Sequence, residues 1–527
     1  MALSRREILK LGAFGGAALV WPTQRLVQAA IDPFPNRMPQ SLLPVPFSLS
    51  YQKPPVAVPV RSDSRGDAYR ITMAQTPVEI IPGVGTPMYT YNGTVPGPTI
   101  QAERGRPIVV RFVSELPAKD LALGYDQWTS VHLHGSPSLP QYDGYASDIT
   151  KPGQYKDYRY PNSQTARTLW YHDHGLHHTA QNCFQGLFAM YTLHEPAEDA
   201  LGLPTGEYEL PIVISDIMLQ KDGKVLFTLA EQNGMYGDMI CVNGRPWPAL
   251  KVKRRKYRFR VLNGSMSRSY NLSLSSGDSF QVISTDAGLM PAPQTVTSYR
   301  QSMAERYEIV IDFAKYQPGD RIILRNNNPK NNQGFANIDK VMAFDVVDDA
   351  FDPSNNSVPA VLNPTHEAML AKESDAVATR QFKLFRTKGQ WTVNGATWEK
   401  VVASNFQFTE ANPEVGSTEI WEVTNDSGGW FHPFHIHLVD FRILSRNGQP
   451  PNAYEQGPKD VVYVGEKETV RLLMRFESPG KYMMHCHNLM HEDHDMMTQF
   501  EVVRNGGSAQ SSPMSARALN LPERTSL

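Results

Sequence analysis

The order of apolar and polar residues along the chain predicts many short strands and few helices. Runs rich in valine, isoleucine, tyrosine and phenylalanine, such as Ile108–Val113, recur between turn residues. Short runs of this composition, bounded by glycine and proline, are typical of β-sandwiches and barrels. The 40 prolines and 37 glycines of the chain supply the breaks between strands. We therefore predict an all-β fold built from sandwiches.

One pattern occurs three times, and it consists of an alternating strand, a turn and a second strand. The copies are Ile108–Gly135, Tyr257–Leu274 and Glu419–Leu438. In the first and third copies the second strand carries two histidines separated by one residue, whereas no histidine occurs between His194 and His366. A chain of 527 residues has room for two or three domains, and the repeat favours three.

Changes in composition indicate where these domains end. Residues 348–378 are rich in aspartate, asparagine, proline and alanine, which is typical of a linker. Residues from 506 onwards are rich in glycine and serine, which is typical of a frayed terminus. We expect domains over residues 45–200, 201–350 and 375–505, and a flexible tail over residues 506–527.

Ten of the 15 histidines and one of the three cysteines fall into four short motifs near the two ends of the chain. The motifs are His132-Leu133-His134, His172-Asp173-His174, His432-Pro433-Phe434-His435-Ile436-His437 and His485-Cys486-His487-Asn488-Leu489-Met490-His491, which continues to Met496. Imidazole and thiolate groups are borderline and soft metal ligands. One metal ion cannot use so many of them, so the motifs predict a cluster of copper ions.

The last motif carries the ligand types of a blue copper centre, which are two histidines, a cysteine and a weak axial methionine. Cys486, His491 and Met496 recur at intervals of five residues, and His432 can supply the second histidine. Alternate side chains of a strand point to opposite faces. If Cys486 faces one metal ion, its two histidine neighbours face another, so only a few covalent bonds separate the two sites.

The eight remaining histidines suit three further copper ions, with open positions for a small molecule. The same alternation turns both imidazoles of each His-x-His pair to one side. Because these pairs come from both ends of the chain, we expect the first and third domains to touch across the cluster. The middle domain is expected to carry no copper.

The chain resembles the multicopper oxidases over about residues 85–503. The sequences that carry the resemblance are WYHDHG, VNGRPWP, KYRFRVLNGSMSRSY, SMAERYEIVIDF, HPFHIHLVDF and HCHNLMHEDHDMM. Their combination is most similar to the bilirubin oxidase branch, close to the spore-coat laccases. The resemblance implies three cupredoxin-like domains, which are Greek-key β-sandwiches, and four copper ions: one of type 1, one of type 2 and two of type 3.

The resemblance also implies a role for each ligand. The type 1 ligands are His432, Cys486, His491 and the axial Met496. The type 2 ligands are His132 and His435. The type 3 ligands are His134, His172, His174, His437, His485 and His487. Every ligand position is filled, which argues against a copper-free structural member of this fold.

The implied activity is one-electron oxidation of an organic donor, coupled to reduction of dioxygen to water. Phenols, aromatic amines and bilirubin-like tetrapyrroles are the expected donors, and a cuprous or ferrous oxidase is the alternative. Cuprous oxidases of this family tend to carry a methionine-rich insertion, whereas residues 348–400 contain only Met369. A ferroxidase needs acidic groups beside the type 1 histidines, and the near neighbours in sequence are Asp493 and Asp495.

Dioxygen reduction also needs protons, so carboxylates are expected near the cluster as catalytic residues. Glu492 follows a type 1 ligand, and Asp143 lies nine residues past His134, where the resembling enzymes carry an acidic residue. Each could instead be a loop carboxylate that caps a turn. Trp430 is a candidate for the donor entrance or a core residue. Asn488 could tune the type 1 site through hydrogen bonds near the sulfur, or cap its loop.

The N-terminus resembles a twin-arginine export signal. Arg5 and Arg6 precede the weakly apolar stretch Leu11–Trp21, and cleavage after Ala29 fits the small-residue rule. We therefore expect residues 1–29 to be removed and the mature protein to be periplasmic or secreted. A basic amphipathic start without an export role is the alternative.

Charge and cysteine content limit the partners. A formal net charge of −2 gives no reason to expect nucleic acid or an anionic membrane as a partner. The expected partners are therefore dioxygen and the organic donor. We expect the protein to be a monomer. Three cysteines exclude a disulfide framework. Cys183 and Cys241 are expected to be buried thiols, with a bridge between them as the alternative.

Overall fold

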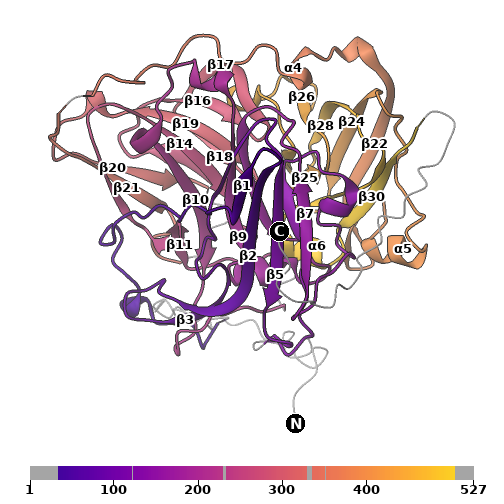
Figure 1. Cartoon of the computed structure of the whole chain (residues 1–527), viewed down its shortest axis with the longest axis horizontal. Helices are drawn as coiled ribbons and strands as arrows, with labels where there is room; N and C mark the ends of the chain where they lie inside the picture. The colour runs from indigo at the N-terminus through magenta and orange to yellow at the C-terminus, as the bar shows by residue number, and fades with distance from the viewer. Residues whose placement is uncertain (1–33, 121–122, 230–232, 329–334, 351, 505–527) are drawn as a thin grey trace, which may run out of the picture. The chain divides into compact units, whose positions relative to one another are not determined.

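Strands dominate the protein, as a computed structural model of residues 34–120, 123–229, 233–328, 335–350 and 352–504 shows. In these residues the strands form six sheets, and we call the pairs of sheets the first sandwich (residues 61–194), the second (209–346) and the third (376–502) (Figure 1). This arrangement confirms the predicted all-β fold. The expected export signal and the expected tail lie outside the described residues.

The first sandwich packs a five-stranded sheet against a four-stranded sheet. Its strands are β1 (Arg61–Asp63), β2 (Gly66–Val78), β3 (Thr86–Tyr91), β4 (Ile100–Glu103), β5 (Ile108–Glu115), β6 (Val131–His134), β7 (Tyr155–Tyr160), β8 (Arg167–Asp173) and β9 (Phe188–His194). The larger sheet has the order β1-β2-β5-β7 with β3 beside β2, and the smaller has the order β4-β9-β8-β6. Apolar residues of both sheets share one buried core.

The second sandwich is the largest and pairs a seven-stranded sheet with a five-stranded sheet. Its strands are β10 (Glu209–Ile217), β11 (Met239–Val242), β12 (Arg245–Pro246), β13 (Ala249–Val252), β14 (Lys256–Asn263), β15 (Tyr270–Leu274), β16 (Phe280–Thr285), β17 (Gly288–Val296), β18 (Ser298–Gln301), β19 (Arg306–Asp312), β20 (Arg321–Asn326) and β21 (Lys340–Val346). The orders are β12-β11-β10-β14-β19-β16-β17 and β13-β21-β20-β15-β18. The rings of Phe259 and Phe344, 5.1 Å apart, join the two sheets.

The third sandwich pairs a five-stranded sheet with a four-stranded sheet. Its strands are β22 (Ala376–Thr387), β23 (Gln390–Val393), β24 (Thr418–Asp426), β25 (His432–Ile436), β26 (Phe441–Arg446), β27 (Val461–Val464), β28 (Thr469–Arg475), β29 (Gly480–Cys486) and β30 (Met497–Val502). The orders are β23-β22-β24-β28-β26 and β27-β25-β29-β30. As in the first sandwich, residues of both sheets fill one core.

Helices are short and lie between strands. They are the α-helices α2 (Thr179–Phe184), α3 (Pro196–Asp199), α4 (Glu367–Leu370), α5 (Trp398–Ala403) and α6 (Leu489–Asp493), and the 3-10 helices η1 (Gln40–Leu42), η2 (Pro140–Tyr142), η3 (Gly206–Tyr208), η4 (Phe313–Lys315), η6 (Glu373–Asp375) and η7 (Ala453–Glu455). Across the part of the chain that the structure describes, none of the helices has the length and apolar character needed to span a membrane.

The two strands expected in each repeated segment are confirmed. The first strands of the three copies are β5, β14 and β24, and the second strands are β6, β15 and β25. The two strands of a copy do not pair with each other, because each lies in a different sheet of its sandwich. All four histidine motifs therefore lie on, or directly after, strands of the four-stranded sheets of the first and third sandwiches.

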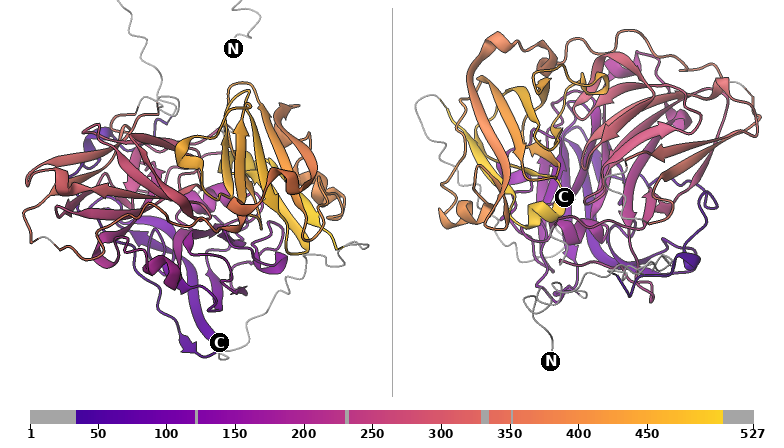
Figure 2. Two further views of the ribbon diagram at one scale, coloured as in Figure 1. Left: turned by 90° about the horizontal axis from the view of Figure 1, so that it is seen from above. Right: turned by 180° about the vertical axis from the view of Figure 1, so that it is seen from behind.

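The first sandwich contacts both others, as the two views of Figure 2 show. Towards the third sandwich, the Tyr145 hydroxyl donates to Gln499 Oε1 at 2.6 Å and Arg167 pairs with Asp440 at 2.7 Å. Towards the second, the Thr168 hydroxyl donates to a carboxylate oxygen of β19 at 2.8 Å. We call the contact between the two four-stranded sheets the seam.

Candidate metal centre

Strand alternation sorts the motif residues of the third sandwich into two groups. Cys486 lies opposite Phe434 in the register of β29 and β25, and both side chains belong to the buried core. His485 lies opposite His435 one position away, so these imidazoles occupy the other face, which is the seam. His432 is two residues from Phe434 on β25 and therefore shares the inner face with Cys486.

The first sandwich follows the same rule. On β6 and β8, Leu133 and Tyr171 point into the core, while His132 and His172 lie opposite each other in the register. These strands are buried along their whole length, because their own core covers one face and the seam covers the other. The two outer faces thus bring histidines of both sandwiches together.

Three groups of potential ligand atoms made of histidines alone lie at the seam, and a further one there adds Asp143 to His132 and His437. Within each group the ligand atoms are no more than 4.8 Å apart, and every residue is buried. The three histidine groups are His132, His134 and His435; His134, His172 and His487; and His174, His437 and His485. Each group takes residues from both sandwiches, and together the groups contain all eight histidines that the sequence assigned to the cluster.

One more group lies inside the third sandwich and contains His432, Cys486 and His491. The Cys486 sulfur is 3.3 Å from His432 Nδ1 and 3.6 Å from His491 Nδ1, and these two nitrogens are 3.2 Å apart. The Cys486 amide donates to the carbonyl of Met496 at 3.1 Å, which places this buried methionine beside the group. The Asn488 amide donates to the sulfur at 3.4 Å.

The donor set fits a bound metal. Among the described residues, His132 Nε2, His172 Nε2, His435 Nε2 and both ring nitrogens of His487 are buried without a hydrogen-bond partner. An unsatisfied buried polar atom costs roughly 1–3 kcal/mol, and metal ions would satisfy these. Burial lowers the pKa of His172, His435 and His487 well below the usual value, which keeps them in the neutral form that binds metals.

Comparison with known proteins agrees with this donor set. Multicopper oxidase family models match residues 72–198, 209–341 and 357–506. Bilirubin oxidase of Albifimbria verrucaria is 42% identical over 451 residues, which cover 82% of this chain and 76% of the relative. The chain belongs to the multicopper oxidase family. Membership implies copper as the metal and confirms the resemblance found in the sequence.

Two further relatives place the protein within this family. A laccase of Bacillus subtilis is 32% identical over 525 residues, covering 87% of this chain and 97% of the relative. The crystal structure of the McoA multicopper oxidase of Aquifex aeolicus superposes with a TM-score of 0.75 at 30% identity, covering 86% of this chain and all of that one. The expected cupredoxin-like fold is therefore confirmed.

The two predicted catalytic carboxylates both reach the seam. Glu492 on α6 is buried, with Oε2 3.0 Å from His485 Nδ1 and Oε1 3.6 Å from His174 Nε2. Asp143 accepts from His437 Nδ1 at 2.8 Å through Oδ2. Burial raises the pKa of Asp143. Burial also raises the pKa of Glu492, but the adjacent imidazoles outweigh it and leave that pKa below its usual value.

Trp430 lies beside the cysteine-containing group and is partly exposed. Its ring centroid is 6.2 Å from that of His491. Trp391, which the sequence did not single out, is closer: it stacks on His491 at 4.3 Å and is fully buried. The exposed guanidinium of Arg386 lies 4.9 Å over the Trp391 ring. No local sequence pattern marks Trp391, because β23 is far in sequence from the motif that contains His491 and comes close to it only when the chain is folded.

Asn488 caps its loop, which is one of the two roles considered for it. Its side chain caps α6 by accepting from the Met490 amide at 3.3 Å, and it also accepts from the Ser267 hydroxyl at 2.9 Å. The hydrogen bond to the Cys486 sulfur comes from the backbone amide, not from the side chain. The loop conformation that the side chain stabilises therefore aims this amide at the sulfur.

The remaining cysteines and histidines lie outside the metal groups. Cys183 and Cys241 are free and buried, as expected. His177 is half-exposed, and His178 packs on Trp128 with ring centroids 3.9 Å apart. His494 Nδ1 contacts the carbonyl of a neighbouring turn of α6 at 2.6 Å. None of these three histidines belongs to a metal group within the described ranges.

Proposed function

We propose that the protein oxidises organic donors with dioxygen. His432, Cys486, His491 and Met496 would hold a copper ion that supplies one-electron oxidation of the donor, and the seam histidines would hold three further copper ions that supply the reduction of dioxygen to water. In this assignment the type 2 ligands are His132 and His435. The type 3 ligands are His134, His172, His174, His437, His485 and His487. The single observation that carries the proposal is the position of Cys486, which belongs to the inner group while both neighbours belong to seam groups.

Glu492 and Asp143 are the carboxylates that we assign to proton supply. Both are buried at about 2% exposure, and each contacts an imidazole of the seam from a different side. Glu492 reaches the site from α6, and Asp143 reaches it from the loop after η2. The site therefore has two groups that are able to hold a proton. This supports a catalytic role for each over simple capping of a turn.

Organic donors fit the surroundings of the inner group better than metal ions do. The Asp493 carboxylate, which could have bound ferrous iron, is buried and accepts from the amides of Thr179 and Ala180 at 3.1 and 2.8 Å. The exposed cation Arg386 lies over the Trp391 ring that stacks on His491, and its positive charge repels metal ions. Partly exposed Trp430 offers an aromatic face to phenols, aromatic amines and tetrapyrroles.

Absorption spectra and donor rates together test the proposal. The copper-loaded protein should show an intense red-region band with a near-ultraviolet shoulder, and Cys486→Ser should lose the band while keeping the shoulder. Rates on bilirubin, a syringyl phenol, cuprous ion and ferrous ion are then compared side by side. A colourless copper-loaded protein would contradict the copper assignment, and faster turnover of either metal ion would replace the organic donor by a metal-ion oxidase.

Export and assembly belong to the same proposal. The paired arginines near the start of the chain support twin-arginine export to the periplasm or the medium, with folded protein as cargo. Three domains, a copper-free middle one and a monomeric state are the organisation that we propose for the mature enzyme. Size-exclusion chromatography with light scattering tests the monomer, and the mass of the exported protein tests the cleavage.

A further inference from the structure

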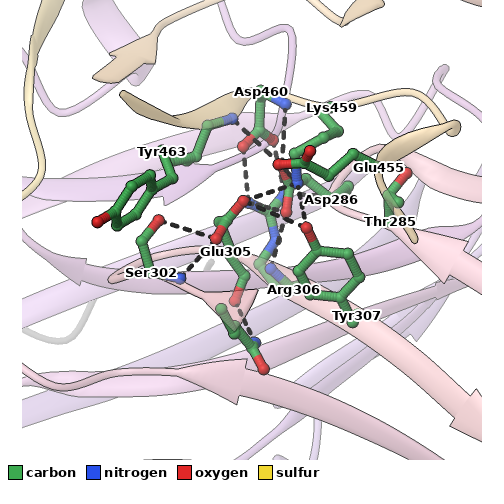
Figure 3. Close-up of polar contacts among 12 residues, drawn as sticks. Thr285, Asp286, Ser302, Glu305, Arg306, Tyr307, Glu455, Lys459, Asp460 and Tyr463 are labelled. Carbon is green, nitrogen blue, oxygen red and sulfur yellow. Dashed lines mark hydrogen bonds and ion pairs between the residues drawn. The ribbon is translucent and has the colours of Figure 1, made fainter. Parts of the chain in front are cut away.

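Five charged side chains are buried where the second and third sandwiches meet (Figure 3). We call them the junction cluster, and its members are Asp286, Glu305, Arg306, Lys459 and Asp460. All five are at most 2% exposed. Lys459 Nζ lies 2.9 Å from Asp286 Oδ2 and 3.0 Å from Glu305 Oε1. Replacing such a network by well-packed apolar residues is often neutral or stabilising, so fold stability alone does not account for it.

Arg306 fixes Asp460 with its whole guanidinium group. Nη1 donates to Asp460 Oδ1 at 2.7 Å and Nη2 to Oδ2 at 2.5 Å, a bidentate pair. The remaining N–H groups donate to carbonyls of Thr168, Ala304 and Asp286 at 2.9–3.2 Å. Thr168 belongs to the first sandwich, and Asp460 belongs to the third, in the segment before β27. Arg306 itself belongs to the second sandwich, so this one side chain joins all three sandwiches. Asp460 is therefore fixed in position and orientation.

The fixed carboxylate reaches the seam. Asp460 Oδ1 lies 3.1 Å from His134 Nε2, and the carbonyl of Asp460 lies 2.8 Å from His435 Nδ1. The residue after His134 is Gly135, at φ +90°, where a Cβ would lie 2.5 Å from Arg306 Nη2 and 2.9 Å from Asp460 Oδ2. A side chain at this position would push the ion pair away from the histidine, so the glycine keeps that contact possible.

His134 is held the opposite way round from three other histidines of the seam. His132, His172 and His435 each use Nδ1 for a hydrogen bond to a backbone carbonyl, at 2.6, 2.8 and 2.8 Å, and leave Nε2 without a partner. In His134 it is Nε2 that contacts Asp460, and Nδ1 has no partner among the described residues. Which ring nitrogen binds a metal is set by the hydrogen bond of the other nitrogen.

We propose that Asp460, clamped by Arg306, is a positioning residue that keeps the proton of His134 on Nε2 and presents Nδ1 to the metal. The second sandwich, whose described residues belong to none of the metal groups, thus selects one ligand atom of the seam. This inference rests on the proposed role of His134 as a copper ligand, but the proton position is a property of the metal-free protein. A carboxylate that accepts from a ligand histidine fixes the ring and raises its basicity.

The metal-free protein gives the first test. Nitrogen NMR of protein with ¹⁵N-labelled histidine distinguishes the two tautomers, and the His134 signal is the one lost in His134→Gln. We expect the proton on Nε2 in the wild type and a shift of population towards Nδ1 in Asp460→Asn. A wild-type proton on Nδ1 would overturn the inference. Failure of the protein to bind copper would overturn the proposed function and leave this result unaffected.

Copper loading gives the second test, with Glu198→Gln as the matched control. Glu198 is also buried and pairs with Arg258 and with Arg260 (3.2 Å), between the first and second sandwiches and away from the metal groups. Asp460→Asn should weaken copper binding at the seam roughly 10- to 100-fold and lose the near-ultraviolet shoulder, while the red band stays. The control should keep both features. Equal spectra for the two variants would show that Asp460 is only a structural contact and does not position His134.

Discussion

Changing Glu492 to glutamine tests proton supply with almost no change in shape. The carboxylate is buried, 3.0 Å from His485 Nδ1 and 3.6 Å from His174 Nε2. Glutamine keeps an acceptor for His485 but cannot hold and release a proton at neutral pH. A positioned acid or base contributes roughly 10²- to 10⁴-fold to a rate. Because Asp143 remains as a second carboxylate, we expect the lower end, about a 100-fold loss of turnover.

Asp493→Asn is the matched control for this change. Asp493 is the next residue on α6 and is also buried, but its carboxylate accepts from the amides of Thr179 and Ala180 and does not reach the seam. Its substitution should lower the free energy of unfolding and leave turnover within about twofold, because surface-to-seam proton transfer does not use it. The red band should persist in both variants.

The assay is steady-state dioxygen consumption with a saturating organic donor, together with the absorption spectrum of each variant. Slow turnover with an unchanged red band is the expected result for Glu492→Gln. Unchanged turnover would remove Glu492 from the proton route. A similar slowing in Asp493→Asn would show that the effect comes from general disturbance of α6 and not from the lost proton carrier.

Three further predictions concern stability and export. Trp398→Ala should destabilise the protein by about 3–5 kcal/mol in urea unfolding, because this fully buried ring of α5 packs on Tyr145 of the first sandwich with centroids 5.3 Å apart; a loss below 1 kcal/mol would contradict this. Burial lowers the pKa of His366 from 6.5 to about 4, so the folded state binds fewer protons and the free energy of unfolding should fall by up to about 3 kcal/mol as pH drops through that window. His366→Asn should flatten this dependence, and an equal slope in both proteins would refute it. Replacing Arg5 and Arg6 by lysine should block export, measured by fractionation, and unimpaired export would exclude the twin-arginine route.

The sequence determined the ligand inventory and its division into two sites. Period-two alternation alone predicted that Cys486 and its two histidine neighbours face different sites, because a strand has two faces wherever it is placed. The structure confirms this, since Cys486 lies in the core of the third sandwich and His485 lies at the seam. The repeated strand–turn–strand pattern likewise located β5, β14 and β24 with the strands that follow them.

Only the tertiary structure decided what surrounds the ligands. Asp460 and Arg306 are 154 residues apart and meet at His134, and Trp391 stacks on His491 from a distant strand. Asp493 and Glu492 are adjacent in sequence, yet the turn of α6 sends one to the amides of α2 and the other to the seam. Local patterns fix which face of its own element a residue occupies. They cannot fix which other element covers that face, because long-range packing of the whole chain decides it.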